Sequence, residues 1–127
     1  MSTQEQQNIL VDVKTEYIPD QSDKNQQRFV FAYHVTISNE GNQPAQLISR
    51  HWIITDGNKQ VQEVRGEGVI GKQPTIKPGE NFEYTSGAVL ETPVGSMHGS
   101  YEMVGANGEM FHTKIPVFTL ASPNALN

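Results

Sequence analysis

The sequence contains no cysteine among its 127 residues. This absence excludes disulfide bridges, thiolate nucleophiles and cysteine-ligated zinc or iron–sulfur sites. No apolar run approaches the ~20 residues of a membrane-spanning helix, so no membrane partner is expected. The first eight residues, MSTQEQQN, lack the apolar segment of a secretory signal. We therefore expect a cytoplasmic protein.

Basic residues are also scarce, with 9 Lys and Arg against 14 Asp and Glu and a net charge of -5. No run of Lys or Arg occurs anywhere in the chain. Proteins that bind the phosphate backbone usually carry a basic stripe. Nucleic acid is therefore not an expected partner.

Residues for catalysis are few and scattered. Ser96 lies two positions from His98, which places both on one face of a strand, but no acid partner is evident. The four histidines show no short metal-binding spacing and are His34, His51, His98 and His112. Distant strands could still bring two of them together, so a metal site is the minor alternative. We predict no enzyme activity, no catalytic residue, no metal ligand and no cofactor.

The sequence does contain segments in which apolar residues recur at every second position. Seven such segments are separated by turn signals, at 8–18, 28–39, 46–56, 58–64, 81–90, 96–105 and 109–120. A hydrophobic content of 35% suits a thin sandwich, in which about every second strand residue faces water. The pattern predicts an all-β protein, an antiparallel β-sandwich of immunoglobulin or fibronectin type III-like architecture.

The length predicts a single domain over residues 1–127, with flexible tails at 1–7 and 121–127 where the chain is small and polar. The alternation predicts a core that includes Val11, Val13, Phe29, Phe31, Tyr33, Val35, Trp52, Ile54, Tyr84, Tyr101, Met103 and Phe111.

The last hairpin has two possible loops around Asn107 and Gly108. A two-residue loop would place Tyr101 and Met103 on the opposite face from Phe111. A three-residue loop, 106–108, pairs Met103 with Phe111 and gathers the large apolar groups on one face. We predict the three-residue loop, with Gly108 in the left-handed conformation that it requires.

Gly66, Gly68 and Gly71 spell G-x-G-x-x-G, and with Lys72 they spell most of a P-loop. Both motifs need a helix after the last glycine, and KQPTIKPGEN forbids one. The P-loop hydroxyl is also replaced by Gln73. The favoured interpretation is a shaped loop between strands. The alternative is a nest of backbone amides that binds anions weakly, helped by Arg65 and Lys72.

Arg50 and Trp52 are the other candidates. The single Trp lies inside an apolar strand, so the favoured interpretation is a core residue between sheets. If Trp52 were exposed beside Arg50, the two would form an anchor for a protein partner.

Four ordered blocks of the chain closely resemble the ApaG family. They are RHWIITD (50–56), EVRGEGVIGKQPTIKPGE (63–80), FEYTSGAVLETPVGSMHGSYEMV (82–104) and FHTKIPVFTL (111–120). The resemblance runs over about residues 8–120. It implies a fibronectin type III-like sandwich in a small bacterial cytosolic protein.

The resemblance also implies an association with cobalt tolerance and magnesium efflux, and with genes for diadenosine tetraphosphate hydrolysis. Related domains in eukaryotes look like protein-binding modules, and the family supplies no catalytic residue to carry over. Our first hypothesis is therefore a non-enzymatic module that binds another protein, with its oligomeric state open. The alternative is a phosphate or nucleotide sensor that uses the loop from Gly66 to Lys72.

Overall fold

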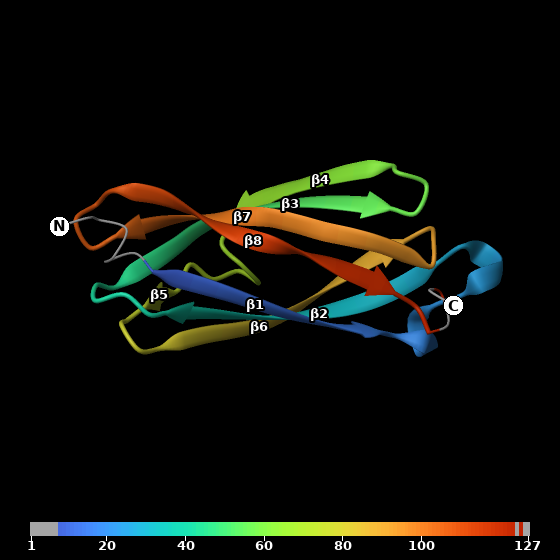
Figure 1. Ribbon diagram of the computed structural model, residues 1–127, viewed down its shortest axis with the longest axis horizontal. Coiled ribbons are helices and arrows are strands. Elements are labelled where there is room, and N and C mark those ends of the chain that lie inside the picture. Colours follow the sequence, from blue (N-terminus) through green and yellow to red (C-terminus); the bar gives the residue numbers. More distant parts are fainter. Residues whose placement is uncertain (1–7, 124, 126–127) are drawn as a thin grey trace.

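The computed structural model describes residues 8–123 and 125, and it contains two antiparallel sheets packed face to face (Figure 1). One sheet has the order β1-β2-β6, and the other has the order β4-β3-β7-β8 with β5 paired to β3. The strands are β1 (Ile9–Tyr17), β2 (Phe29–Asn39), β3 (Ala45–Asp56), β4 (Val61–Glu67), β5 (Thr75–Ile76), β6 (Asn81–Leu90), β7 (Val94–Gly105) and β8 (Met110–Ala121). The predicted sandwich is confirmed.

The seven predicted segments correspond to the seven long strands, and β5 is an addition that the alternation did not predict. It lies between Pro74 and Pro78, in a stretch for which the alternation predicts no strand. Two short 3-10 turns, Pro19–Gln21 and Lys24–Gln26, connect β1 to β2. Within the described part of the chain, no helix has the length and apolar character to cross a membrane.

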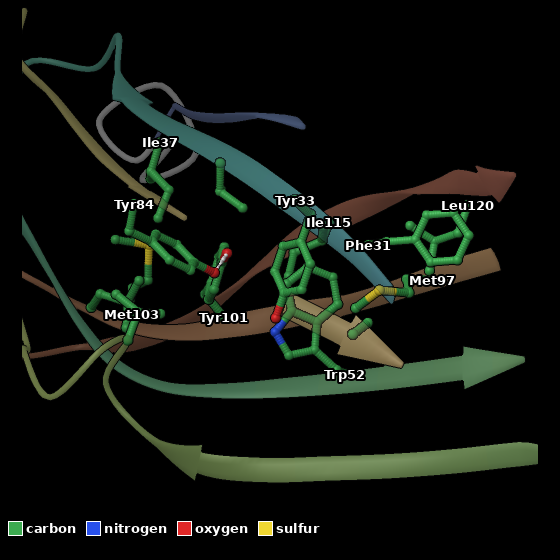
Figure 2. Packing of buried hydrophobic residues seen from close by; sticks show 14 of the residues in the cluster. Phe31, Tyr33, Ile37, Trp52, Tyr84, Met97, Tyr101, Met103, Ile115 and Leu120 are labelled. Carbon is green, nitrogen blue, oxygen red and sulfur yellow. Dashed lines mark hydrogen bonds between the residues drawn. The ribbon is translucent and has the colours of Figure 1, made fainter. Parts of the chain in front are cut away.

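The core lies between the two sheets, as Figure 2 shows. Alternate residues of β2 face inward, from Phe29 to Ile37, and each is at most 6% exposed. Trp52 from the facing sheet packs edge-on against Tyr33, with ring centroids 5.2 Å apart. A central Trp between sheets is the predicted arrangement, and it is confirmed at 2% exposure.

Four residues of the predicted core are only half-buried: Val11, Val13, Ile54 and Phe111. The two valines lie on β1, an edge strand with a neighbour on only one side in its sheet. Other buried side chains were not on the predicted list, and the least exposed of them are Ile37, Leu47, Val69, Ile76, Met97, Ile115 and Leu120. These side chains face the other sheet. How deeply each one is buried depends on which residues of that sheet cover it.

The predicted tail at 1–7 lies outside the described residues. The other predicted tail starts too early, because Ala121 still pairs with Val94 in the sheet. The amide of Ser122 then donates to the carbonyl of Pro93 at 2.9 Å, and Ser122 is buried. The backbone hydrogen bond therefore holds Ser122 beside the end of the sheet.

The β7–β8 hairpin confirms the three-residue loop. Met103 pairs with Phe111 and Tyr101 with Thr113. The amide of Gly108 donates to the carbonyl of Gly105 at 2.9 Å, and Gly108 has a φ of 82°.

We expect Gly108→Ala to lower the free energy of unfolding by about 1–2 kcal/mol, because an L-residue resists the left-handed region. A Cβ at this position would meet nothing within 4 Å, so the loss reports conformation and not a clash. Urea denaturation measures it. Gly108→Asn is the control and should lose less, since Asn tolerates this region. Equal stability of wild type and the Ala variant would contradict the loop assignment.

Tyr84 of β6 and Tyr101 of β7 join the two sheets by a hydrogen bond between their hydroxyl groups (Figure 2). Both side chains are buried. Burial raises the pKa of Tyr84 and that of Tyr101 well above the ordinary value, because the phenolate would be desolvated.

We expect stability to fall as the pH rises above about 10, where an exposed tyrosine titrates. Below that pH the pair is protonated in both the folded and the unfolded state and contributes no pH dependence. Above it, the unfolded chain releases protons that the folded chain retains, which favours unfolding. Tyr84→Phe and Tyr101→Phe should each make this fall shallower, measured by urea denaturation between pH 8 and pH 11. A slope equal to that of wild type in both variants would contradict a buried, shared proton network.

Candidate functional site

A β-bulge in β3 decides which side chains face outward. The register between β3 and β7 shifts between Leu47 and Ser49, so Ile48 is the additional residue. Leu47 is buried before the bulge, and Trp52 is buried after it. Because of this shift, Ser49 and His51 lie on the outer face of the sheet.

The outer face carries a polar groove of about 370 Å³. It crosses four strands and is lined by Ser49, Arg50, His51, Arg65, Gly66, Glu67, Ser100, Glu102 and His112. We call it the outer-face groove. Its lining residues come from opposite positions in the register, such as Ser49, Glu102 and His112 on β3, β7 and β8.

The ionisable groups of this groove pair with one another. The hydroxyl of Ser49 donates to Oε1 of Glu102 at 3.3 Å, and Nε2 of His112 lies 3.8 Å from Oε2 of the same carboxylate. On the other side, Nε2 of His51 and a guanidinium nitrogen of Arg65 lie 3.4 and 3.5 Å from Oε2 of Glu63. These are surface pairs in water, each contributing little to stability.

The described residues include no group of three or more His, Cys, Asp or Glu side chains placed to hold a metal ion. Ser49 and His112 contact the carboxylate of Glu102, and His51 and Arg65 contact that of Glu63. The groove therefore places acidic, basic and imidazole side chains on one face of the sheet.

Arg50 points to the inner side of β4. One of its guanidinium nitrogens donates to the carbonyls of Glu67 and Gly68, at 3.1 and 2.9 Å. These carbonyls stand where β4 ends and the glycine loop begins. Arg50 therefore holds the end of β4 in place.

Each glycine of the G-x-G-x-x-G sequence has its own structural reason. A Cβ on Gly66 would lie 2.7 Å from the Arg50 guanidinium, and one on Gly68 would collide with the carbonyl of Lys72. Gly68 and Gly71 also have φ values of 62° and 77°. Gly66 belongs to β4, and not to the loop where the sequence placed it, because β4 runs to Glu67.

The backbone of the loop is used within the fold. The amide of Gly68 donates to the carbonyl of Ile48 at 2.7 Å, and Gln73 Nε2 donates to the same carbonyl at 2.9 Å. Val69 and Lys72 exchange two hydrogen bonds across a tight turn, at 2.8 and 2.9 Å. Three of the amides that a nest would need, those of Gly68, Val69 and Lys72, already have acceptors.

The tight turn from Val69 to Lys72 also explains the shape of the loop. Its central residues, Ile70 and Gly71, have φ values of 44° and 77°, as a two-residue hairpin turn requires. Ile is unfavourable there, since a β-branched residue rarely adopts a positive φ. Val69 is fully buried and fixes the turn to the core.

The structure brings together only some of the predicted site residues. Arg50, Arg65 and Gly66 all line the outer-face groove. Gly68, Gly71 and Lys72 lie beyond it, in the turn. Trp52 is 2% exposed, so the condition under which it would anchor a partner beside Arg50 is not met.

Sequence reasoning missed six groove residues: Ser49, His51, Glu67, Ser100, Glu102 and His112. The usable signal was the polar half of the alternation in β7 and β8, at Ser100, Glu102 and His112. Their pairing with β3 depends on the bulge at Ile48, and no sequence pattern predicts that bulge.

Comparisons with known proteins agree with this architecture. The sequence profile of the ApaG domain matches residues 19–105. The protein ApaG of Aromatoleum aromaticum is 56% identical over 127 residues, covering all of both chains. That of Pseudomonas aeruginosa is 60% identical over 125 residues, or 98% of each chain.

Among solved structures, the crystal structure of a Bordetella pertussis protein called ApaA superposes with a TM-score of 0.90 at 57% identity, covering 92% of this chain and 95% of the other. The two-sheet fold is thus shared with this solved relative. The chain belongs to the ApaG family.

We expect Gly66→Ala to lower the free energy of unfolding by roughly 1–2 kcal/mol, because the new Cβ displaces the Arg50 guanidinium from its two carbonyl acceptors. The control is a double-mutant cycle with Arg50→Ala. Once the guanidinium is absent, Gly66→Ala should cost much less, and urea denaturation gives the coupling energy. If the effects of the two substitutions on the free energy of unfolding are strictly additive, the Arg50 guanidinium is not the reason that position 66 needs a glycine.

Proposed function

We propose that this ApaG-family chain is a non-enzymatic binding module that acts in the cytoplasm on another protein. The observation that carries the proposal is the outer-face groove, a polar surface across four strands that presents Arg65, Glu67 and Glu102 together with His51 and His112. Ser49 with Glu102, His112 with Glu102 and His51 with Glu63 form its pairs. Such a surface offers electrostatic complementarity, which gives a protein interface its specificity.

The alternative is a sensor of phosphate or nucleotides. Arg65 and His51 in the groove favour it, because both can donate to a phosphate oxygen. Glu63, Glu67 and Glu102 stand among them, and their carboxylates oppose a second negative charge. Lys72 lies in the tight turn, away from this groove. Protein binding is therefore the better supported function.

The association with cobalt tolerance and magnesium efflux, implied by the family resemblance, fits a module of this kind if the effect passes through its partner. We propose an indirect role of that type. The His–Glu pairs of the groove are exposed and each has only one carboxylate, whereas hard cations such as Mg²⁺ prefer several oxygen ligands.

Affinity capture from native cytosol tests the proposal, using the immobilised wild-type protein and a variant with Glu102→Lys at the centre of the groove. We expect a partner that wild type retains and this variant loses. Glu83→Lys is the matched control, because Glu83 lies on β6 in the other sheet, in an exposed position. The same captures, made with and without ATP and Mg²⁺, distinguish a protein-binding module from a nucleotide sensor. A partner lost equally from both variants, or none retained, would refute this site.

We expect the purified protein to turn over neither nucleotides nor phosphoesters, and to bind ATP or a diadenosine polyphosphate with a dissociation constant near or above ~1 mM. The physical reason is that the loop amides of Gly68, Val69 and Lys72 are already hydrogen-bonded. Amide chemical shifts during a nucleotide titration measure the affinity. Saturable micromolar binding centred on residues 66–72 and abolished by Lys72→Ala would favour the sensor instead.

A further inference from the structure

The outer face of the β1-β2-β6 sheet carries a polar cluster that is separate from the outer-face groove. Its members are Glu16 of β1, His34 of β2 and Thr85 of β6, and all three are exposed. His34 lies opposite Thr85 in the register, with Lys14 of β1 on its other side. The three strands run side by side in this order, and β6 forms the edge of the sheet (Figure 1).

Hydrogen bonds connect these three side chains across the sheet. Nδ1 of His34 lies 2.7 Å from the hydroxyl oxygen of Thr85. Nε2 of the same ring lies 3.4 Å from Oε1 of Glu16. Within the described part of the chain, no other hydrogen bond joins a hydroxyl group to an imidazole, and in the outer-face groove the hydroxyl of Ser49 donates to a carboxylate instead.

Glu16 decides which nitrogen of His34 carries the proton. An ionised carboxylate only accepts hydrogen bonds, so the neutral ring has its proton on Nε2, facing Glu16. Nδ1 then keeps its lone pair and accepts from the hydroxyl of Thr85. An orienting acid, a base and a hydroxyl in this order are the arrangement that activates a hydroxyl as a nucleophile.

The hydroxyl of Thr85 is accessible to a reagent in solution. Thr85 is exposed and lies on the edge strand β6, and the side chain of His34 is 46% exposed. Two positions away on these strands, Ala32 pairs with Gly87, so a small residue and a glycine adjoin the hydrogen-bonded pair. A flat carbonyl group can therefore approach the hydroxyl oxygen from the solvent side.

The surroundings of Thr85 select the chemical class of the reagent. Among the described residues, its hydroxyl is hydrogen-bonded to His34 and to no amide or cation that would stabilise an oxyanion, so the reagent must carry a good leaving group. The carboxylates of Glu16 and Glu83 lie on the same face, the second accepting from Thr36 at 3.3 Å. Their charge disfavours an anionic donor such as an acyl phosphate. An uncharged activated ester or thioester meets both conditions.

We propose that Thr85 is an acylation site for uncharged activated esters or thioesters, with His34 as the general base and Glu16 as its positioning residue. Nδ1 of His34 takes the hydroxyl proton while Oγ1 of Thr85 forms a bond to the acyl carbon. The bond from that carbon to the leaving group breaks, and Nδ1 passes the proton to the leaving group. The acyl group is then an ester of Thr85, so the step modifies the chain and needs no protein partner.

The test treats the full chain with p-nitrophenyl acetate, stops the reaction in acid and measures the acetylation of each hydroxyl by peptide mass spectrometry. Two residues serve as references: Thr36, whose hydroxyl donates to a carboxylate, and Thr75, which is exposed on β5. We expect Thr85 to react at least roughly tenfold faster than either reference. His34→Gln should lower the rate at Thr85 to that of the references, because a carboxamide accepts a hydrogen bond but does not take up the proton.

A second variant tests the positioning residue. Glu16→Gln should slow the acetylation of Thr85 roughly threefold, because the charge that stabilises the imidazolium is lost while the hydrogen-bond acceptor remains. Asp12→Asn is the matched control and should leave the rate unchanged, since Asp12 is an exposed carboxylate on the same face of β1, opposite Thr36. Asp12, Glu16 and His34 are all exposed, so these variants should remain folded.

The pH dependence of the reaction distinguishes a base from a residue with a structural role only. The charged groups around His34 are Lys14 and Glu16 from β1 and Glu83 from β6. The rate at Thr85 relative to the reference residues should rise between about pH 5 and pH 8, because a protonated imidazole has no lone pair to accept the proton. His34→Gln should abolish this rise.

Three outcomes would overturn the inference: equal rates at Thr85 and at the two reference residues, an unchanged rate at Thr85 in His34→Gln, or a pH-dependent rise that this variant retains in full. The result is independent of the proposed function, because the outer-face groove lies on the other sheet and Glu102→Lys reports on it separately.

Discussion

The additional residue at Ile48 is the constraint on which much of this structure depends. It changes the phase of β3, so that Leu47 and Trp52 both reach the core although five positions, an odd number, separate them. Without the bulge, strict alternation would turn one of them toward water. The carbonyl of Ile48 also accepts from Gly68 and from Gln73, so one residue fixes both the register and the glycine loop.

The inward position of Arg50 results from the same shift in the alternation of β3. Arg50 lies on the inner side beside Gly66, and its guanidinium reaches the carbonyls that end β4. A guanidinium in this position needs acceptors with fixed geometry, and a strand end supplies unpaired carbonyls. In the sequence that resembles a nucleotide motif, Gly66 therefore lets an arginine come close to the backbone, and Gly68 lets the loop pass close to Lys72.

The arrangement divides the molecule into surfaces of different character. The outer face of the β4-β3-β7-β8 sheet has the polar outer-face groove, and a second groove between β4 and β6 is lined by Ile54 and Leu90 with the carboxylates of Asp56 and Glu91. The two surfaces share β4 and are supported by the same core, where Trp52 packs against Tyr33.

The sequence by itself determined the strands, the antiparallel sandwich and the loop at Gly108, because these depend on local alternation and on the conformations open to glycine. It also excluded both nucleotide motifs, since the prolines after Gly71 forbid a helix. Only the tertiary structure decided that His51 and Glu102 lie on one face and that Trp52 does not reach the surface. The reason is physical: a bulge shifts a strand by one residue at little local cost, and its position is selected by the packing of the two sheets, which no single segment of sequence records.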